Sequence, residues 1–186
     1  MKIEDIFTDV GVNTWYYDYI TYIYRNGIMT GITDTEFVPE GTLTRAQMAM
    51  VLYRLEDTPD VEYSGVFRDV KDEYWYTDAI MWAAESKIVD GYSEGLYGPD
   101  MTITREQMIV MMYRYANYKK YEISGSKVLS SFTVANKVSG YALEAMIWAV
   151  GNGIIDGKYE GIIEPQSSIT RAECATILMR FMEMFR

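Results

Sequence analysis

The chain has 186 residues, of which 49% are hydrophobic and 15% aromatic, enough to bury a substantial core. Its formal net charge of -10 repels phosphate backbones and anionic lipid, so we expect neither nucleic acid nor a membrane as a partner. The absence of histidine and the single cysteine remove the usual zinc sites, histidine-assisted nucleophiles and any intrachain disulfide, so we expect no catalytic residue, no metal and no cofactor.

One unit recurs three times along the chain. An arginine directly follows a threonine in each copy, and the copies are offset by 60 and then 66 residues. The three stretches are LTRAQ (43–47), ITREQ (103–107) and ITRAE (169–173). We therefore divide the chain into copies at 1–57, 58–118 and 119–186, which together form one compact unit.

Each copy is predicted to fold as helix, loop, helix. In the first helix, apolar residues recur at i, i+4, i+7 and i+8, as in Trp15, Tyr19, Tyr22 and Ile23 of copy one. Glycines and a proline then interrupt the helical pattern and predict a loop. The second helix begins at the repeated threonine, because the spacing of a capping box is present in all three copies: Thr44 with Gln47, Thr104 with Gln107, and Thr170 with Glu173.

The four tryptophans divide into two groups. Trp82 and Trp148 are expected in the core. For Trp15 and Trp75 the helical spacing leaves core and ligand platform equally open. Cys174 falls on the apolar face of the last helix, where a buried, unreactive thiol is expected.

The repeated arginine is not explained by helix capping. At the first helical position a cation faces the positive end of the helix dipole, which is unfavourable by a few tenths to about 1 kcal/mol. Its recurrence predicts a negative partner. That partner is either an anionic ligand, held by the guanidinium and the free N–H groups of the helix start, or an acidic side chain of a neighbouring copy, such as Asp9 or Asp69.

These elements resemble the S-layer homology (SLH) domain. Their order in copy one is Phe7-Thr8-Asp9-Val10, Trp15, Gly27 to Gly31, Phe37-Val38-Pro39 and Thr44-Arg45, and it recurs in the other copies. The resemblance implies a mostly α-helical protein, with three helix-loop-helix repeats in a pseudo-threefold, spindle-like array and grooves between adjacent repeats. It also implies a binding role outside the cell.

The role implied by the resemblance is non-covalent anchoring of exported proteins to the bacterial cell wall or S-layer. The partner would be a secondary cell wall polysaccharide that carries pyruvate ketals, each of which places a carboxylate on a sugar. The ligand-binding residues carried over from the family are Arg45, Arg105 and Arg171 for the carboxylate, Asp9, Asp69, Trp15, Trp75 and Tyr141 for the sugar, and Gly31, Gly91 and Gly157 for close approach.

Copy three departs from this pattern, because Val134 replaces the aspartate and Tyr141 the tryptophan. Copy one has Thr30 where the other copies have an aspartate. We therefore expect unequal grooves. An alternative function is a protein interaction or assembly module that has lost its glycan site, and an enzyme is not expected.

The sequence contains no run of about 18 apolar residues, and Met1 to Asp5 lacks the apolar core of a secretory signal. An exported protein would then carry its signal outside this sequence, and we expect an exported cargo domain fused to this one.

Overall fold

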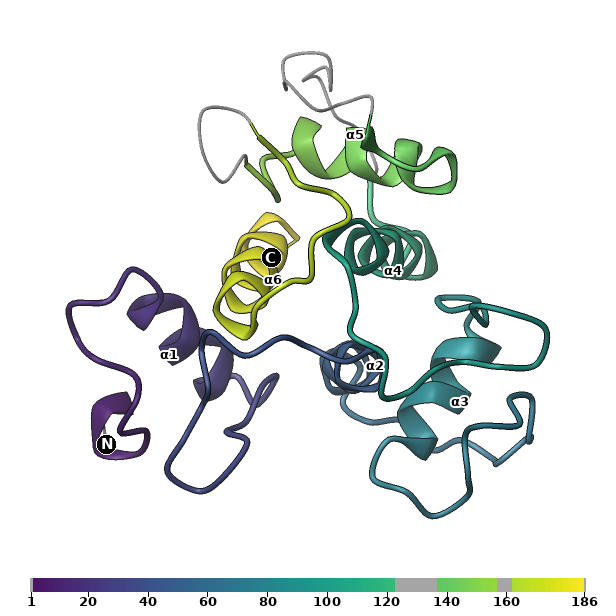
Figure 1. The fold of residues 1–186 in the computed structure, drawn as a ribbon, viewed down its shortest axis with the longest axis horizontal. Coiled ribbons are helices and arrows are strands. Elements are labelled where there is room, and N and C mark those ends of the chain that lie inside the picture. Colours follow the sequence, from purple (N-terminus) through teal and green to yellow (C-terminus); the bar gives the residue numbers. More distant parts are fainter. Residues whose placement is uncertain (1, 123–136, 157–161, 186) are drawn as a thin grey trace. The chain divides into compact units, whose positions relative to one another are not determined.

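The computed structural model describes residues 2–122, 137–156 and 162–185. Within these ranges the chain is mostly helical and has no β-strand, which confirms the predicted α class (Figure 1). The elements in chain order are η1 (Ile3–Asp5), α1 (Tyr17–Arg25), α2 (Arg45–Leu55), α3 (Thr77–Glu85), α4 (Arg105–Tyr118), η4 (Gly140–Ala142), α5 (Leu143–Gly151) and α6 (Arg171–Met184). None of these helices is long and apolar enough to cross a membrane.

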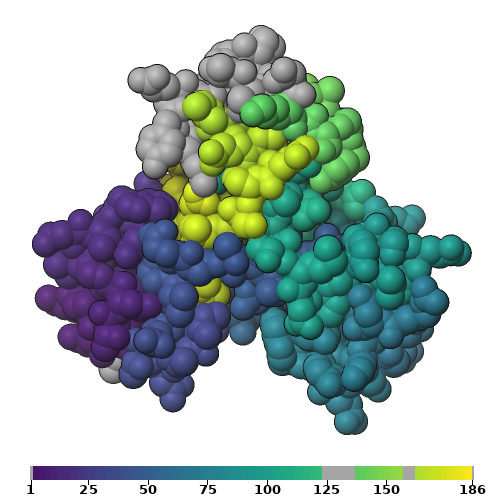
Figure 2. Space-filling model, in the orientation of Figure 1, coloured from purple at the N-terminus to yellow at the C-terminus, as the bar shows by residue number. Residues whose placement is uncertain are grey.

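The chain divides into two compact units. Unit 1 comprises residues 1–43 and 169–186, and unit 2 comprises residues 44–168. In unit 1, α1 packs against α6; in unit 2, α2 packs against α3 and α4 against α5 (Figure 1). The residues of copy two form one continuous surface, coloured teal in the space-filling view (Figure 2). The spindle arrangement and the copy boundaries at 57 and 118 stay predictions.

The start of every second helix is confirmed as predicted. Thr44 is the N-cap of α2; its hydroxyl accepts a hydrogen bond from the Gln47 N–H at 3.2 Å, and the Gln47 side chain accepts one from the Thr44 N–H at 3.0 Å. Reciprocal bonding of this kind satisfies two backbone donors at once. The same capping box starts α4 at Thr104 and α6 at Thr170.

The first two N–H groups of each second helix dock onto the loop of another copy. In α2, the Arg45 N–H donates to the Met101 carbonyl at 2.9 Å and the Ala46 N–H to the Pro99 carbonyl at 3.0 Å. The corresponding acceptors are Ser167 and Pro165 for α4, and Gly41 and Pro39 for α6. The helix starts are therefore not free, so these N–H groups do not contribute to the anionic-ligand alternative.

In copies two and three the first helix buries the predicted face except for its opening aromatic residue, as Ala79, Trp82 and Ala83 show for copy two. Trp82 and Trp148 lie in the core as expected. Trp15, however, precedes α1 and is 57% exposed, because the chain does not become helical until Tyr17. The core of this helix is formed by Ile20 and Ile23.

Gly31 is required by close packing rather than by a left-handed backbone. A Cβ on Gly31 would lie 2.3 Å from the Thr33 carbonyl oxygen and 2.5 Å from the Phe7 ring. Gly91 is similarly enclosed by the carbonyls of Ser93 and Leu96. Neither backbone is left-handed, so both positions require glycine for the lack of a side chain and not for a positive φ.

Candidate functional site

The three repeated arginines reach across to another copy in the same way. Their side chains are only 5% to 8% exposed. In unit 2, Arg45 donates through Nε to the Tyr97 carbonyl at 2.7 Å and through Nη2 to the Asp90 carbonyl at 3.3 Å. Its guanidinium also lies 4.6 Å from the centre of the Tyr97 ring. Main-chain carbonyls and an aromatic face thus offset the unfavourable position of this cation at a helix start.

The other two arginines have equivalent bonds. Arg105 donates through Nε to the Ile163 carbonyl at 3.0 Å in unit 2. In unit 1, Arg171 donates to the carbonyls of Phe37 and Thr30 at 2.7 and 2.6 Å. Each arginine therefore fastens its own helix to the loop of another copy.

Asp9 and Asp69 act within their own copies. The Asp69 carboxylate accepts the N–H groups of Tyr97 at 2.8 Å and Gly98 at 2.7 Å. The Asp9 carboxylate accepts those of Phe37 and Val38 at 2.9 and 2.6 Å. Among the described residues, neither aspartate pairs with a repeated arginine, so the salt-bridge alternative is wrong for these two residues.

The aromatic residues at the start of each copy are exposed. Trp15, Trp75 and Tyr141 are 57%, 58% and 61% exposed. Trp15 and Trp75 precede their helices, and Tyr141 lies in the short η4 turn. For Trp15 and Trp75, the open choice between core and surface is therefore resolved in favour of the surface.

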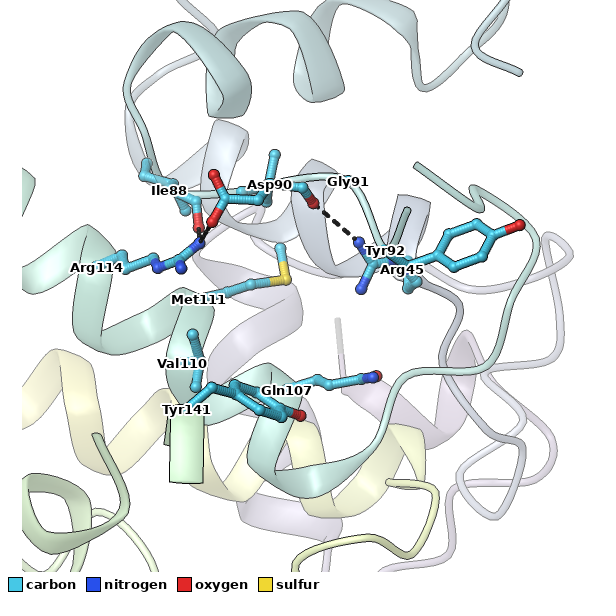
Figure 3. Close-up of a pocket in the computed structure, with 11 residues that line it drawn as sticks. Arg45, Ile88, Asp90, Gly91, Tyr92, Gln107, Val110, Met111, Arg114 and Tyr141 are labelled. Carbon is cyan, nitrogen blue, oxygen red and sulfur yellow. Dashed lines mark hydrogen bonds and ion pairs between the residues drawn. The ribbon is translucent and has the colours of Figure 1, made fainter. Parts of the chain in front are cut away.

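A cavity of about 380 Å³ opens beside Arg45 in unit 2. Its lining comes from three copies: Arg45 from copy one, the Ile88–Tyr92 loop and α4 from copy two, and Tyr141 from copy three (Figure 3). Asp90 and Gly91 lie on one side of the space, and Gln107 and Tyr141 lie on the other (Figure 3). We call this cavity the Arg45 groove.

Two guanidinium groups line the Arg45 groove. The second belongs to Arg114 in α4, whose Nη1 lies 2.7 Å from a carboxylate oxygen of Asp90. Both partners are at least partly exposed, and such a surface ion pair contributes little to stability. Arg45 has five N–H donors, of which the two bonds described above use two. The groove therefore has hydrogen-bond donors available for an anion.

Tyr141 presents its ring to solvent while its hydroxyl is held within the protein. The hydroxyl donates to Glu106 at 3.0 Å. Burial of the hydroxyl, and secondly this hydrogen bond, raise the pKa of Tyr141 to about 12. The residue is therefore neutral at physiological pH, with one ring surface open to a ligand.

The structure brings only part of the predicted site into the Arg45 groove. Arg45, Gly91 and Tyr141 line it, whereas Asp69 and Trp75 do not belong to its lining. The remaining predicted residues lie elsewhere in the two units, and Gly157 falls outside the described residues.

Arg114 was not predicted, although the sequence held a signal for it. Arg54, Arg114 and Arg180 recur at the same offsets of 60 and 66 residues as the Thr-Arg pair. Gln107 was interpreted only as a capping residue, and Asp90 only as the counterpart of Thr30. Arg114, Gln107 and Asp90 line one cavity because α4 packs against the Ile88–Tyr92 loop, which no local spacing predicts.

Comparison with known proteins shows what the repeated unit is. A model of the S-layer homology domain matches residues 6–49, 66–109 and 132–175. An amylopullulanase of Thermoanaerobacterium thermosulfurigenes is 32% identical over 98% of this chain and 10% of its own length. Exoglucanase XynX of Acetivibrio thermocellus is 32% identical over 98% of this chain and 17% of its own.

A cellulosome-anchoring protein of Acetivibrio thermocellus is 30% identical over 79% of this chain and 33% of its own length. The chain thus spans between a tenth and a third of these relatives. Since the family model matches three times in tandem and covers most of the sequence, the chain belongs to the S-layer homology domain family.

Proposed function

We propose that this chain is a non-catalytic binding module that anchors the protein carrying it to the bacterial cell surface. It binds an anionic secondary cell wall polysaccharide, with a pyruvate ketal as the recognised group. Support comes from its membership of the S-layer homology family and from a relative that is named a cellulosome-anchoring protein.

The observation that carries the proposal is the pair of guanidinium groups in the Arg45 groove. Arg45 and Arg114 supply positive charge to a cavity in a protein whose net charge is -10. Charged donors in a concave site with an aromatic neighbour are suited to a carboxylate attached to a sugar ring. In this arrangement the ligand carboxylate replaces Asp90 on Arg114, and the sugar stacks on the exposed ring of Tyr141.

The predicted site residues outside the Arg45 groove are proposed to serve equivalent sites. These are Arg105, Arg171, Asp9, Asp69, Trp15, Trp75, Gly31 and Gly157. Asp9, Asp69 and Gly31 also support the loops structurally, so substitutions there would mix binding with folding. Arg114 is the sharper probe because it is half-buried and does not start a helix.

The test is a calorimetric titration with purified pyruvylated wall polymer. The wild-type chain is compared with Arg114→Ala, and each titration is repeated after mild acid removal of the ketal. We expect Arg114→Ala to weaken binding about tenfold, the loss of roughly one charge-assisted hydrogen bond. The melting temperature should change little, since the lost ion pair is at the surface.

Arg68→Ala is the matched control, because it removes the same charge from an exposed side chain outside the groove. It should bind the polymer as the wild type does. Binding that survives removal of the ketal would contradict the carboxylate assignment. No binding of the intact polymer would reject the anchoring proposal and favour the assembly module.

A further inference from the structure

Glu106 is a buried carboxylate at a position where the other two copies have alanine. It is 3% exposed and follows Arg105 in α4, as Ala46 follows Arg45 and Ala172 follows Arg171. A buried carboxylate is unfavourable unless hydrogen bonds compensate for the lost water. Glu106 therefore requires hydrogen-bond partners, whereas Ala46 and Ala172 do not.

The partners of Glu106 come from the segment that opens copy three. Oε1 accepts the Tyr141 hydroxyl at 3.0 Å and the Ser139 hydroxyl at 2.7 Å. Oε2 accepts the Ser139 N–H at 3.0 Å. The carboxylate thus joins the start of α4 to the η4 turn, and one of its three donors is the aromatic side chain of the Arg45 groove.

Tyr141 is itself a departure from the repeat, because Trp15 and Trp75 occupy its position in the other copies. The helix pairing relates these positions: α2 packs on α3, α4 on α5, and α6 on α1. Ala46 therefore corresponds with Trp75, Ala172 with Trp15, and Glu106 with Tyr141. The chain departs from the pattern at both members of one pair and at neither member of the other two.

We propose that Glu106 is a positioning residue that fixes the Tyr141 ring at the rim of the Arg45 groove. In this pair, glutamate and tyrosine replace the alanine and tryptophan of the other copies as a matched set. Tyrosine lacks the second ring of tryptophan, and its hydroxyl supplies a hydrogen bond to the carboxylate. The effect on ligand binding rests on the proposed function, whereas the coupling between the two side chains does not.

The experiment is a double-mutant cycle with two readouts. Glu106→Ala, Tyr141→Trp and the double variant are compared with the wild type by polymer titration and by urea unfolding. We expect each single change to weaken polymer binding about fivefold to tenfold, since residues in direct contact couple by about 1 kcal/mol. The double variant recreates the alanine–tryptophan pair and should bind within about twofold of the wild type.

Two further variants make the result specific. Tyr141→Phe removes only the hydroxyl that bonds to Glu106, and it should also weaken polymer binding. It therefore tests whether this hydrogen bond holds the ring even if Glu106→Ala unfolds. Ser139→Ala removes a different donor to Glu106 and leaves the ring in place, so it should bind as the wild type does. A purely structural role for Glu106 would instead lower the unfolding free energy of all these variants without this selective pattern in binding.

The outcomes separate this inference from the proposed function. If the wild type binds polymer but Tyr141→Phe and Glu106→Ala bind equally well, or the double variant binds no better than the weaker single variant, the positioning role is overturned. If the wild type does not bind polymer, the anchoring proposal fails. The urea unfolding data then test the coupling between Glu106 and Tyr141 by themselves. Additive losses of unfolding free energy in the double variant would overturn the coupling, and recovered stability in the double variant would support it.

Discussion

At the scale of single residues, one arginine serves structure and leaves capacity for a ligand. Arg45 fastens the start of α2 to the loop of copy two through two main-chain carbonyls. A guanidinium is suited to this because its five donors are held in a fixed plane, so bonds on one edge do not exhaust the other. Substituting Arg45 itself would therefore disturb folding and binding together.

A second residue-scale feature is the left-handed backbone position after the first helix of each copy. Two copies have glycine at this position and the third has lysine. Gly27 and Gly153 follow their helices at φ of 72° and 69°, and Lys87 occupies the equivalent position at φ of 58°. A side chain at positive φ is strained.

We expect Lys87→Gly to raise the unfolding free energy by about 0.5–1 kcal/mol, because it removes this strain at an exposed site. Urea denaturation would measure the change. Gly27→Ala is the reciprocal control: a Cβ there has open space around it, so any loss of stability reports backbone strain alone. Equal stability of Lys87→Gly and the wild type would contradict the argument.

At the scale of elements, α2, α4 and α6 begin in the same closed arrangement. The threonine cap takes the third N–H group, and carbonyls of another copy's loop take the first two. An anion is consequently recognised by side chains beside the helix start and not by the helix start itself. In α4, Glu106 adds a side-chain link to the next copy that α2 and α6 lack.

The last helix contains an internal reporter of its own packing. Cys174 is fully buried in α6, and burial raises the pKa of its thiol to about 12. The reactive thiolate is therefore scarce at ordinary pH, and reagents cannot reach it without opening of the helix.

We expect Cys174 to resist a thiol reagent such as Ellman's reagent at pH 8 in native buffer and to react fully in denaturant. The labelling rate between these limits should follow the opening of unit 1. Cys174→Ser provides the blank. Immediate stoichiometric labelling of the native protein would show that α6 is not packed as described.

At the scale of the whole molecule, buried tyrosines set the alkaline limit of stability. Burial raises the pKa of Tyr97 and of Tyr115 well above the ordinary value of 10.0, and the hydrogen bond from Tyr115 to Glu56 adds to the second shift. Because the folded protein holds these protons more tightly than the unfolded chain, their contribution to stability is complete below about pH 10.

We expect the unfolding free energy to fall as the pH rises above about 10, since the unfolded chain loses tyrosine protons first. Urea denaturation between pH 8 and pH 11 would measure the slope. Tyr115→Phe removes one of the groups and should flatten the slope relative to the wild type. A pH profile of the variant parallel to that of the wild type would contradict this assignment.

Features that depend on neighbouring residues and on repetition could be predicted from the sequence alone. The capping boxes at Thr44, Thr104 and Thr170 follow from a spacing of three residues, and the α class and the family follow from a threefold pattern. Burial of Trp82 and Trp148 followed from helical periodicity, which describes a side chain's own helix well.

The contacts of the repeated residues depend on packing between segments that lie far apart in the sequence. Arg45 and Tyr97 are 52 residues apart, and Glu106 and Tyr141 are 35 apart, so no local spacing connects them. The presence of Arg114 in the Arg45 groove likewise depends on how copy one docks on copy two. Arg45 is held by loop carbonyls, which every residue carries, so a sequence pattern does not reveal which loop supplies its partners.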